Sequence, residues 1–344
     1  MIRFECDYTE GAHPQIMQRL LETNMEQTQG YGMDAHCERA RTYIKDICHA
    51  PEADVHFLVG GTQTNTTVIA ATLRPYQGVL AAHTGHINVH ETGAIEATGH
   101  KVLPIPSEDG TITAEQIEQM IQDHYNDNDH EHIVQPGMVY ISYPTENGTL
   151  YSKEQLTKIS RICRKYDIPL FVDGARMGYG LASPACDLTL ADFAELTDVF
   201  YIGGTKVGAL FGEAVVIMKE SLKKDFRYCI KQRGGMLAKG RLLGIQFETL
   251  FEHGLYEEIS HHAVSLALKI KNAFKDKGIS FLYDSYTIQQ FPILTMVQCE
   301  YFKKKYAFSL WCKIDEAHCA VRFCTSWATK SEAVEALIKD IQML

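Results

Sequence analysis

The stretch FYIGGTKVGALFGEA, residues 200–214, places Lys206 in a run of small residues directly after an apolar segment. A solvated lysine needs no such neighbours, and solvated loops are where most lysines are found. A lysine that must contact a bulky group does need small neighbours. The apolar residues before Lys206 and the run that begins at residue 213 are typical of two buried strands. The stretch therefore predicts a strand that ends close to a lysine-containing site.

Five further apolar or strand-like runs surround this stretch and alternate with helical patterns. Two of the helical patterns begin with capping boxes, Thr113 with Gln116 and Ser152 with Gln155, which mark helix N-termini. Alternating strands and helices predict an α/β fold, with a mainly parallel central sheet between layers of helices. The seven expected strands lie at residues 55–59, 78–82, 101–105, 138–143, 168–174, 198–204 and 213–218.

The pattern changes after about residue 245. A long amphipathic helix is expected near 254–277, and a capping box of Thr329 with Glu332 predicts the start of the last helix. We therefore expect a large α/β domain at 1–245, including an N-terminal segment 1–15, and a smaller C-terminal α+β domain at 246–344. The strands expected in the smaller domain lie at 279–284, 293–298, 306–314 and 319–327.

Composition narrows the class of protein. The 344 residues carry a net charge of -10. This charge argues against a nucleic-acid partner, because a protein binds nucleic acid through a basic surface. No apolar run reaches membrane-spanning length, and the start MIRFECDYTEG has no apolar segment typical of a signal peptide. The ten cysteines form no CxxC pair and suggest reduced thiols. We expect a cytoplasmic enzyme without a membrane partner.

Two further strand ends carry residues suited to chemistry. The strand at 55–59 runs into GGTQTN, where Gly60 and Gly61 allow a tight turn. Thr62, Thr64 and Asn65 then open a helix whose free N–H groups favour an anion. This is neither a GxGxxG nor a P-loop pattern. The strand at 168–174 ends in Asp173, with Arg176 three residues later. Each feature alone also fits an ordinary strand–turn–helix junction or a helix N-cap.

Together these features match the needs of one cofactor. Pyridoxal phosphate requires a lysine for its aldehyde, a carboxylate for its pyridine nitrogen and an anion site for its phosphate. The anion turn precedes Asp173, and Lys206 follows that aspartate by 33 residues. The sequence therefore predicts a pyridoxal-phosphate enzyme.

Four segments carry a resemblance to a known family. The chain resembles fold-type I pyridoxal-phosphate enzymes, most closely the threonine aldolase and β-eliminating lyase group. The resemblance covers nearly the whole chain. The segments that carry it are FVDGARMGYGLA, GGTKVGALFGEAVV, HINVHETGA (86–94) and YGMDAHCERA.

The resemblance implies cofactor contacts. Lys206 would bond to the cofactor aldehyde, and Asp173 would pair with the pyridine nitrogen. His86 would stack on the ring, while Gly61 and Thr62 would hold the phosphate.

Substrate contacts and assembly are implied in the same way. Arg176 would lie near both the cofactor and the substrate carboxylate, which Arg322 in AVRFCTSW would grip. Tyr31 and Arg233 would reach the site from a neighbouring subunit. A homodimer or homotetramer is therefore expected.

Two positions depart from the family pattern, and the first is Cys6, which replaces a small hydroxyl residue near the N-terminus. Many threonine aldolases have a histidine near the substrate hydroxyl, and Glu146 in SYPTENGTLYS takes that place here. Aldol cleavage needs a base that removes the β-hydroxyl proton. Glu146 could serve as that base, directly or through water, or it could tune the site for another reaction.

The spacing of His83, His86 and His90 raises zinc as an alternative. We read this stretch as the loop after a strand, where the three side chains would not share a face, and therefore expect no metal site. Three functions remain open. They are cleavage of L-threonine or L-allo-threonine to glycine and acetaldehyde, another pyridoxal-phosphate reaction (β-elimination, racemisation or transamination), and a cofactor-free interaction protein.

Overall fold

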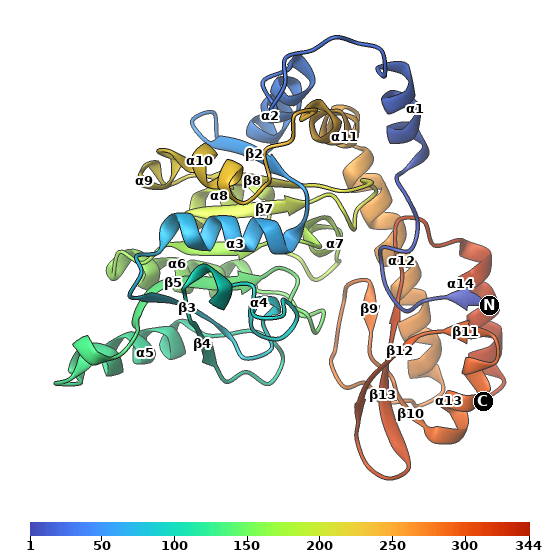
Figure 1. Ribbon diagram of the computed structural model, residues 1–344. Coiled ribbons are helices and arrows are strands. Elements are labelled where there is room, and N and C mark those ends of the chain that lie inside the picture. Colours follow the sequence, from blue (N-terminus) through green and yellow to red (C-terminus); the bar gives the residue numbers. More distant parts are fainter.

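The computed structural model describes residues 1–344 and contains a seven-stranded sheet with the strand order β2-β8-β7-β6-β5-β3-β4 (Figure 1). All seven strands predicted for the large domain are confirmed, with ends shifted by up to three residues. They are β2 (Asp54–Leu58), β3 (Gln77–Ala82), β4 (Val102–Ile105), β5 (Gln135–Ser142), β6 (Leu170–Asp173), β7 (Val199–Gly203) and β8 (Glu213–Ile217).

The sheet is mainly parallel, as predicted, with one exception. Strands β3 to β7 pair in parallel, whereas β8 runs antiparallel to both β7 and β2. Residues 204–212 join β7 directly to β8. A connection this short cannot make the crossover that a parallel neighbour requires, so β8 returns alongside β7.

Helices cover both faces of the sheet, so the predicted layers are confirmed. Val79, Tyr140 and Tyr201 face one core with α3 and α10, while Leu80 and Val139 face the other with α5, α6 and α8. This alternation follows from the two-residue period of a strand. The helices of this part are α1 (Pro14–Glu22), α2 (Ala35–Ile47), α3 (Gly61–Thr72), α4 (His86–Val89), α5 (Ala114–Asn126), α6 (Lys153–Lys165), α7 (Met177–Leu181), α8 (Leu190–Leu196), α9 (Glu220–Lys223), α10 (Phe226–Gln232) and α11 (Arg241–Glu252), with short 3-10 turns at Glu96–Thr98 and His130–His132.

The C-terminal part stands beside the large sheet and contains a four-stranded antiparallel sheet (Figure 1). The long helix predicted near 254–277 is confirmed as α12. The remaining elements are α12 (Leu255–Asp276), β9 (Gln289–Gln290), β10 (Ile293–Thr295), α13 (Met296–Lys303), β11 (Tyr306–Ala307), β12 (Ser309–Lys313), β13 (His318–Cys324) and α14 (Ser331–Gln342).

Two strand predictions in this part need correction. Residues 279–284 form no strand, and Phe281 makes only an isolated bridge to Pro292. The strand predicted at 293–298 stops at Thr295, because Thr295 and Gln298 form a capping box that starts α13.

The capping box predicted for the last helix is wrong. Helix α14 begins at Ser331 after Lys330, and no side chain caps it. The Thr329 hydroxyl instead accepts a hydrogen bond from the Ser326 amide at 2.8 Å. It is therefore engaged in the preceding turn.

The N-terminal segment lies beside α14 and β11 (Figure 1). Strand β1, Ile2–Arg3, pairs with β11 in parallel, and Phe4 is buried in the C-terminal core. The domain boundary at residue 245 falls within α11 and stays a prediction. No helix is both long and apolar enough to span a membrane.

Candidate active site

The candidate site lies at the carboxyl edge of the sheet, where β5, β6 and β7 end side by side. Asp173 is the last residue of β6 and pairs in register with Ser142, the last residue of β5. Lys206 follows β7 by three residues. The strand order therefore brings together residues far apart in the sequence, at the edge where ligands bind in open α/β sheets.

Asp173 is buried and receives four hydrogen bonds. Tyr140 donates to Oδ2 at 2.5 Å and Asn65 donates to the same oxygen at 3.1 Å. The Tyr201 hydroxyl and the Ala175 amide donate to Oδ1, the latter at 3.0 Å. Burial raises the pKa of Asp173, but neighbouring His86 and these donors outweigh burial and lower it below its usual value. Asp173 is therefore held as an anion.

Lys206 lies in a buried setting of mixed charge. Burial and the positive charge of Arg176 lower the pKa of its amine, while Asp7, Asp173 and Glu213 act in the opposite direction. A lowered pKa increases the fraction of neutral amine, which is the nucleophilic form. Lys206 is therefore suited to bond to a carbonyl carbon.

His86 and Glu146 are in direct contact. The His86 amide donates to Glu146 Oε1 at 2.9 Å, and Ser142 Oγ donates to the same oxygen at 2.6 Å. Glu146 Oε2 is buried and has no partner. Burial raises the pKa of Glu146 to about 7 and lowers the pKa of His86 to about 4. Glu146 can therefore exchange a proton near neutral pH, while the His86 ring is neutral.

Asn65 and Glu91 complete this side of the site. The Asn65 amide donates to Glu91 Oε1 at 2.9 Å as well as to Asp173. His86 Nε2 lies 3.8 Å from the same Glu91 oxygen, and burial raises the pKa of Glu91 to about 7. The Asn65 side chain thus links Glu91, which lies close to the His86 ring, to Asp173.

The N-terminus of α3 has the properties of an anion site. Helix α3 begins at Gly61 after Gly60, and no side chain caps its first amides. Thr62 and Arg233 line one polar cavity, of about 560 Å³, and Arg233 Nε is buried without a partner. The Gln63 side chain ties the two segments together by donating to the Arg233 carbonyl at 3.1 Å. Free amides, a helix dipole and an arginine suit a phosphate group.

Arg176 and Arg322 differ in how much of each guanidinium is engaged. Arg176 donates from Nε and Nη2 to the two oxygens of Asp7, at 2.7 and 2.9 Å. Arg322 donates to Gln289 at 3.0 Å and to the Glu5 carbonyl at 2.7 Å, while its Nε is buried without a partner. Arg322 therefore retains a donor for a carboxylate. The positive charge of Arg176 is largely compensated by Asp7.

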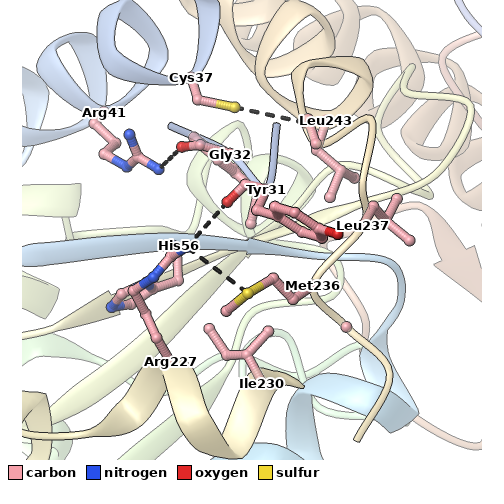
Figure 2. A pocket seen from close by; sticks show the side chains of 13 residues that line it. Tyr31, Gly32, Cys37, Arg41, His56, Arg227, Ile230, Met236, Leu237 and Leu243 are labelled. Atoms are coloured by element: carbon pink, nitrogen blue, oxygen red, sulfur yellow. Dashed lines mark hydrogen bonds between the residues drawn. The ribbon is translucent and has the colours of Figure 1, made fainter. Parts of the chain in front are cut away.

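Tyr31 lies outside this cluster. It lines a small cavity of about 30 Å³ between α2, β2 and α10, where Arg227 donates to the Tyr31 carbonyl at 3.1 Å (Figure 2). Its side chain is 47% exposed, which leaves it available to a second copy of the chain. Its predicted role across a subunit interface stays a prediction.

The segment that carries His83, His86 and His90 was expected to be a loop, but part of it is helical. His86 begins α4, one helical turn, and its ring centre lies 5.6 Å from that of His90. His83 instead accepts a hydrogen bond from the Ser107 amide at 3.1 Å. No cluster of three or more His, Cys, Asp or Glu side chains in the chain could hold a metal ion.

Several site residues were not predicted from the sequence, and they are Tyr140, Ser142, Tyr201, Asp7, Glu91 and Glu213. Tyr140 and Tyr201 lie on the strands flanking β6 and point to the same face, so polar hydroxyls in two otherwise apolar strands were an available signal. Glu213 is buried and accepts from the Gly204 amide at 3.2 Å, and burial raises its pKa to about 8. Its polar side chain at the start of β8 was a similar signal.

The fold and the site together define a class of protein. A mainly parallel sheet with a partly buried lysine, an aspartate and an anion turn at its carboxyl edge is the arrangement of fold-type I enzymes. Aspartate aminotransferase from Thermus thermophilus shares the fold, with a TM-score of 0.72 at 13% identity over 100% of this chain and 92% of that chain. At that identity the likeness concerns the fold alone.

Closer similarities identify the family within this class. A family model described as beta-eliminating lyase matches residues 4–294, and the chain belongs to that family of lyases. A solved threonine aldolase structure from Leishmania major is 43% identical, with a TM-score of 0.97 over 100% of this chain and 99% of that one. The low specificity L-threonine aldolase of Pseudomonas aeruginosa is 27% identical over 99% of this chain and 97% of that protein.

Proposed function

We propose that this chain is a pyridoxal-phosphate-dependent lyase that cleaves L-threonine or L-allo-threonine to glycine and acetaldehyde. The observation that carries the proposal is the joint placement of Lys206 and the four-fold hydrogen-bonded Asp173 at one sheet edge. The relatives named as threonine aldolases support the choice of reaction.

The unsatisfied groups of the site fit this cofactor. The uncapped start of α3 and the free Nε of Arg233 suit its phosphate. A Cβ at Gly61 would lie 3.2 Å from the Tyr201 hydroxyl, so glycine lets the start of α3 lie close to the hydroxyl that binds Asp173. Asp173 stays ionised because its pKa is lowered, which suits a protonated pyridine nitrogen. The site thus supplies a partner for each polar part of pyridoxal phosphate.

When bound, pyridoxal phosphate supplies an aldehyde that bonds to amines and a pyridine ring that accepts the electron pair of a broken bond. The chain's own residues support this chemistry. Lys206 supplies a nucleophilic amine, and Asp173 supplies the negative charge that keeps a pyridine nitrogen protonated. His86, neutral because of its burial, supplies a flat ring for stacking.

The substrate would be held at both ends. Arg322 binds the α-carboxylate through its free Nε, while Gln289 and the Glu5 carbonyl fix the orientation of its guanidinium. Glu146 takes the β-hydroxyl proton at Oε2, its oxygen without a partner. Its other oxygen is held by Ser142 and the His86 amide, so the carboxylate is oriented for this transfer.

Assembly and location belong to the same proposal. A homodimer or homotetramer would bring Tyr31 to a neighbouring site, while Arg233 would contact the phosphate at the cavity of its own chain. The exposed Tyr31 ring, with the Lys231 ammonium 4.9 Å from its centre, supports this role. We place the enzyme in the cytoplasm with a small amino acid as its substrate.

The test is borohydride reduction of the protein supplied with pyridoxal phosphate, followed by peptide mapping and an acetaldehyde assay with both threonine isomers. We expect a covalent label on Lys206 and release of acetaldehyde. Lys206→Ala should lose the label and all turnover, whereas Lys239→Ala, a change at an exposed lysine, should keep both.

Other outcomes would change the proposal. A labelled protein that releases ammonia and pyruvate from serine or cysteine, but no acetaldehyde, would replace aldol cleavage with β-elimination. A Lys206→Ala variant that turns over at the wild-type rate would exclude the proposed role of the lysine.

A further inference from the structure

A line of side-chain contacts runs from Glu146 to Asp173 through two hydroxyl groups. Ser142 Oγ lies 2.6 Å from Glu146 Oε1 and 3.3 Å from the Tyr140 hydroxyl oxygen. Tyr140 in turn donates to Asp173 Oδ2 at 2.5 Å. Tyr140 and Ser142 are two residues apart on β5 and therefore share one face of the sheet. Tyr140, Ser142 and Asp173 are buried. Glu146 is partly buried.

Ser142 has one hydroxyl hydrogen and two acceptors within reach. While Glu146 is ionised, its Oε1 is the stronger acceptor, because hydrogen bonds to charged groups are shorter and stronger than neutral ones. Once Oε2 holds a proton, Oε1 is a neutral carbonyl oxygen that still accepts from the His86 amide. The Ser142 hydroxyl can then turn toward Tyr140.

A hydroxyl that accepts a hydrogen bond becomes a better donor, because hydrogen bonds in a chain polarise one another. Tyr140 donates directly to Asp173, so the turned Ser142 would strengthen that bond. A carboxylate bound by a stronger donor holds its charge better and accepts protons less readily.

We infer that Ser142 and Tyr140 form a relay through which protonation of Glu146 strengthens the hydrogen bond from Tyr140 to Asp173. The inference deepens the proposed function and rests on it for the role of Asp173 beside a pyridine ring. The proton that Glu146 takes from a substrate hydroxyl would thereby make Asp173 less basic. A less basic Asp173 would compete less for the proton of a pyridine nitrogen held beside it.

The coupling is reciprocal, so the state of Asp173 also biases the proton affinity of Glu146. The relay supplies the only side-chain hydrogen bond to the Glu146 carboxylate, since its other donor is the His86 backbone. Other titratable groups act on Glu146 only through their charges. Outside the relay they are Glu91, Arg176 and Tyr151.

The test follows the Tyr140 ring directly by NMR of the full-length, cofactor-free protein carrying ¹³Cζ-labelled tyrosine. Tyr140→Phe assigns the resonance. We expect the Tyr140 signal to shift with pH at the midpoint of Glu146, near pH 7. Ser142→Ala removes one hydroxyl and should abolish this step, as should Glu146→Gln.

Tyr201 is the matched control, because it donates to the other oxygen of Asp173 and lies off the relay. Its resonance should show at most a small fraction of the step. In the cofactor-loaded enzyme, Ser142→Ala and Tyr140→Phe should remove a pH-dependent shift of the cofactor absorption band. Tyr201→Phe should move the band at every pH and keep the step.

The relay is excluded if the Tyr140 resonance does not shift as Glu146 titrates. It is also excluded if Ser142→Ala leaves the pH-dependent shift of the Tyr140 resonance unchanged. These results do not depend on cofactor binding. A protein whose Tyr140 titrates as expected but that forms no covalent complex with pyridoxal phosphate would retain the relay and lose the proposed function.

Discussion

Removal of the Asp7 carboxylate should destabilise the fold through Arg176. The Asp7 side chain is 0% exposed and that of Arg176 is 14% exposed, so solvent screens this ion pair little. Two hydrogen bonds, of 2.7 and 2.9 Å, join them. Breaking a buried pair by removing one partner costs about 3–5 kcal/mol, because the other charge stays buried and uncompensated. We expect this loss in Asp7→Ala.

The loss can be measured as a shift of the thermal midpoint. A chain of 344 residues has an unfolding entropy of about 0.7 kcal/mol/K, so the expected decrease in Tm is about 4–7 °C. Calorimetry on cofactor-free proteins at one scan rate avoids the stabilisation that bound cofactor adds. Because Asp7 has a lowered pKa, its contribution is present above its unfolded pKa of 3.8 and disappears as pH falls through the lower folded value.

A double-mutant cycle with Arg176→Met provides the control. Replacing both partners removes the uncompensated charge, so the double variant should lose less than the sum of the two single losses. A decrease under about 2 °C for Asp7→Ala, well below the range derived from the entropy of unfolding, would refute the reasoning. Losses that simply add in the double variant would refute it as well.

Two further changes test the site itself. Gly174→Ala would place a Cβ too close to the Tyr201 carbonyl oxygen, so β6 and β7 must separate. We expect Tm to decrease by about 4 °C or more. An unchanged Tm would mean that the two strands move apart at no cost. Glu146 must be ionised to accept a proton, so kcat/KM should rise as pH increases through about 7. Glu146→Gln should remove this rise and lower kcat by about 100- to 10,000-fold, and a wild-type rate would place the base elsewhere.

Much of the fold could be predicted because its signals are local. An apolar run of four to eight residues is a strand wherever its neighbours bury it, and the seven strands of the large sheet obey this rule. The capping boxes at Thr113 and Ser152 also form as predicted. The box at Thr329 does not form, because its hydroxyl bonds to Ser326 instead. A local pattern fails where the same group has a competing partner.

The sequence by itself determined that strands and helices alternate, that Asp173 ends a strand and that Lys206 follows one. It could not show that Tyr140, Ser142 and Tyr201 flank Asp173, because those contacts depend on the order β5-β6-β7 in the sheet. Helix and strand signals arise from neighbours a few residues apart. Hydrogen bonds between side chains 28 to 33 residues apart exist only once the sheet has assembled, so the tertiary structure alone decided the charge state and partners of this site.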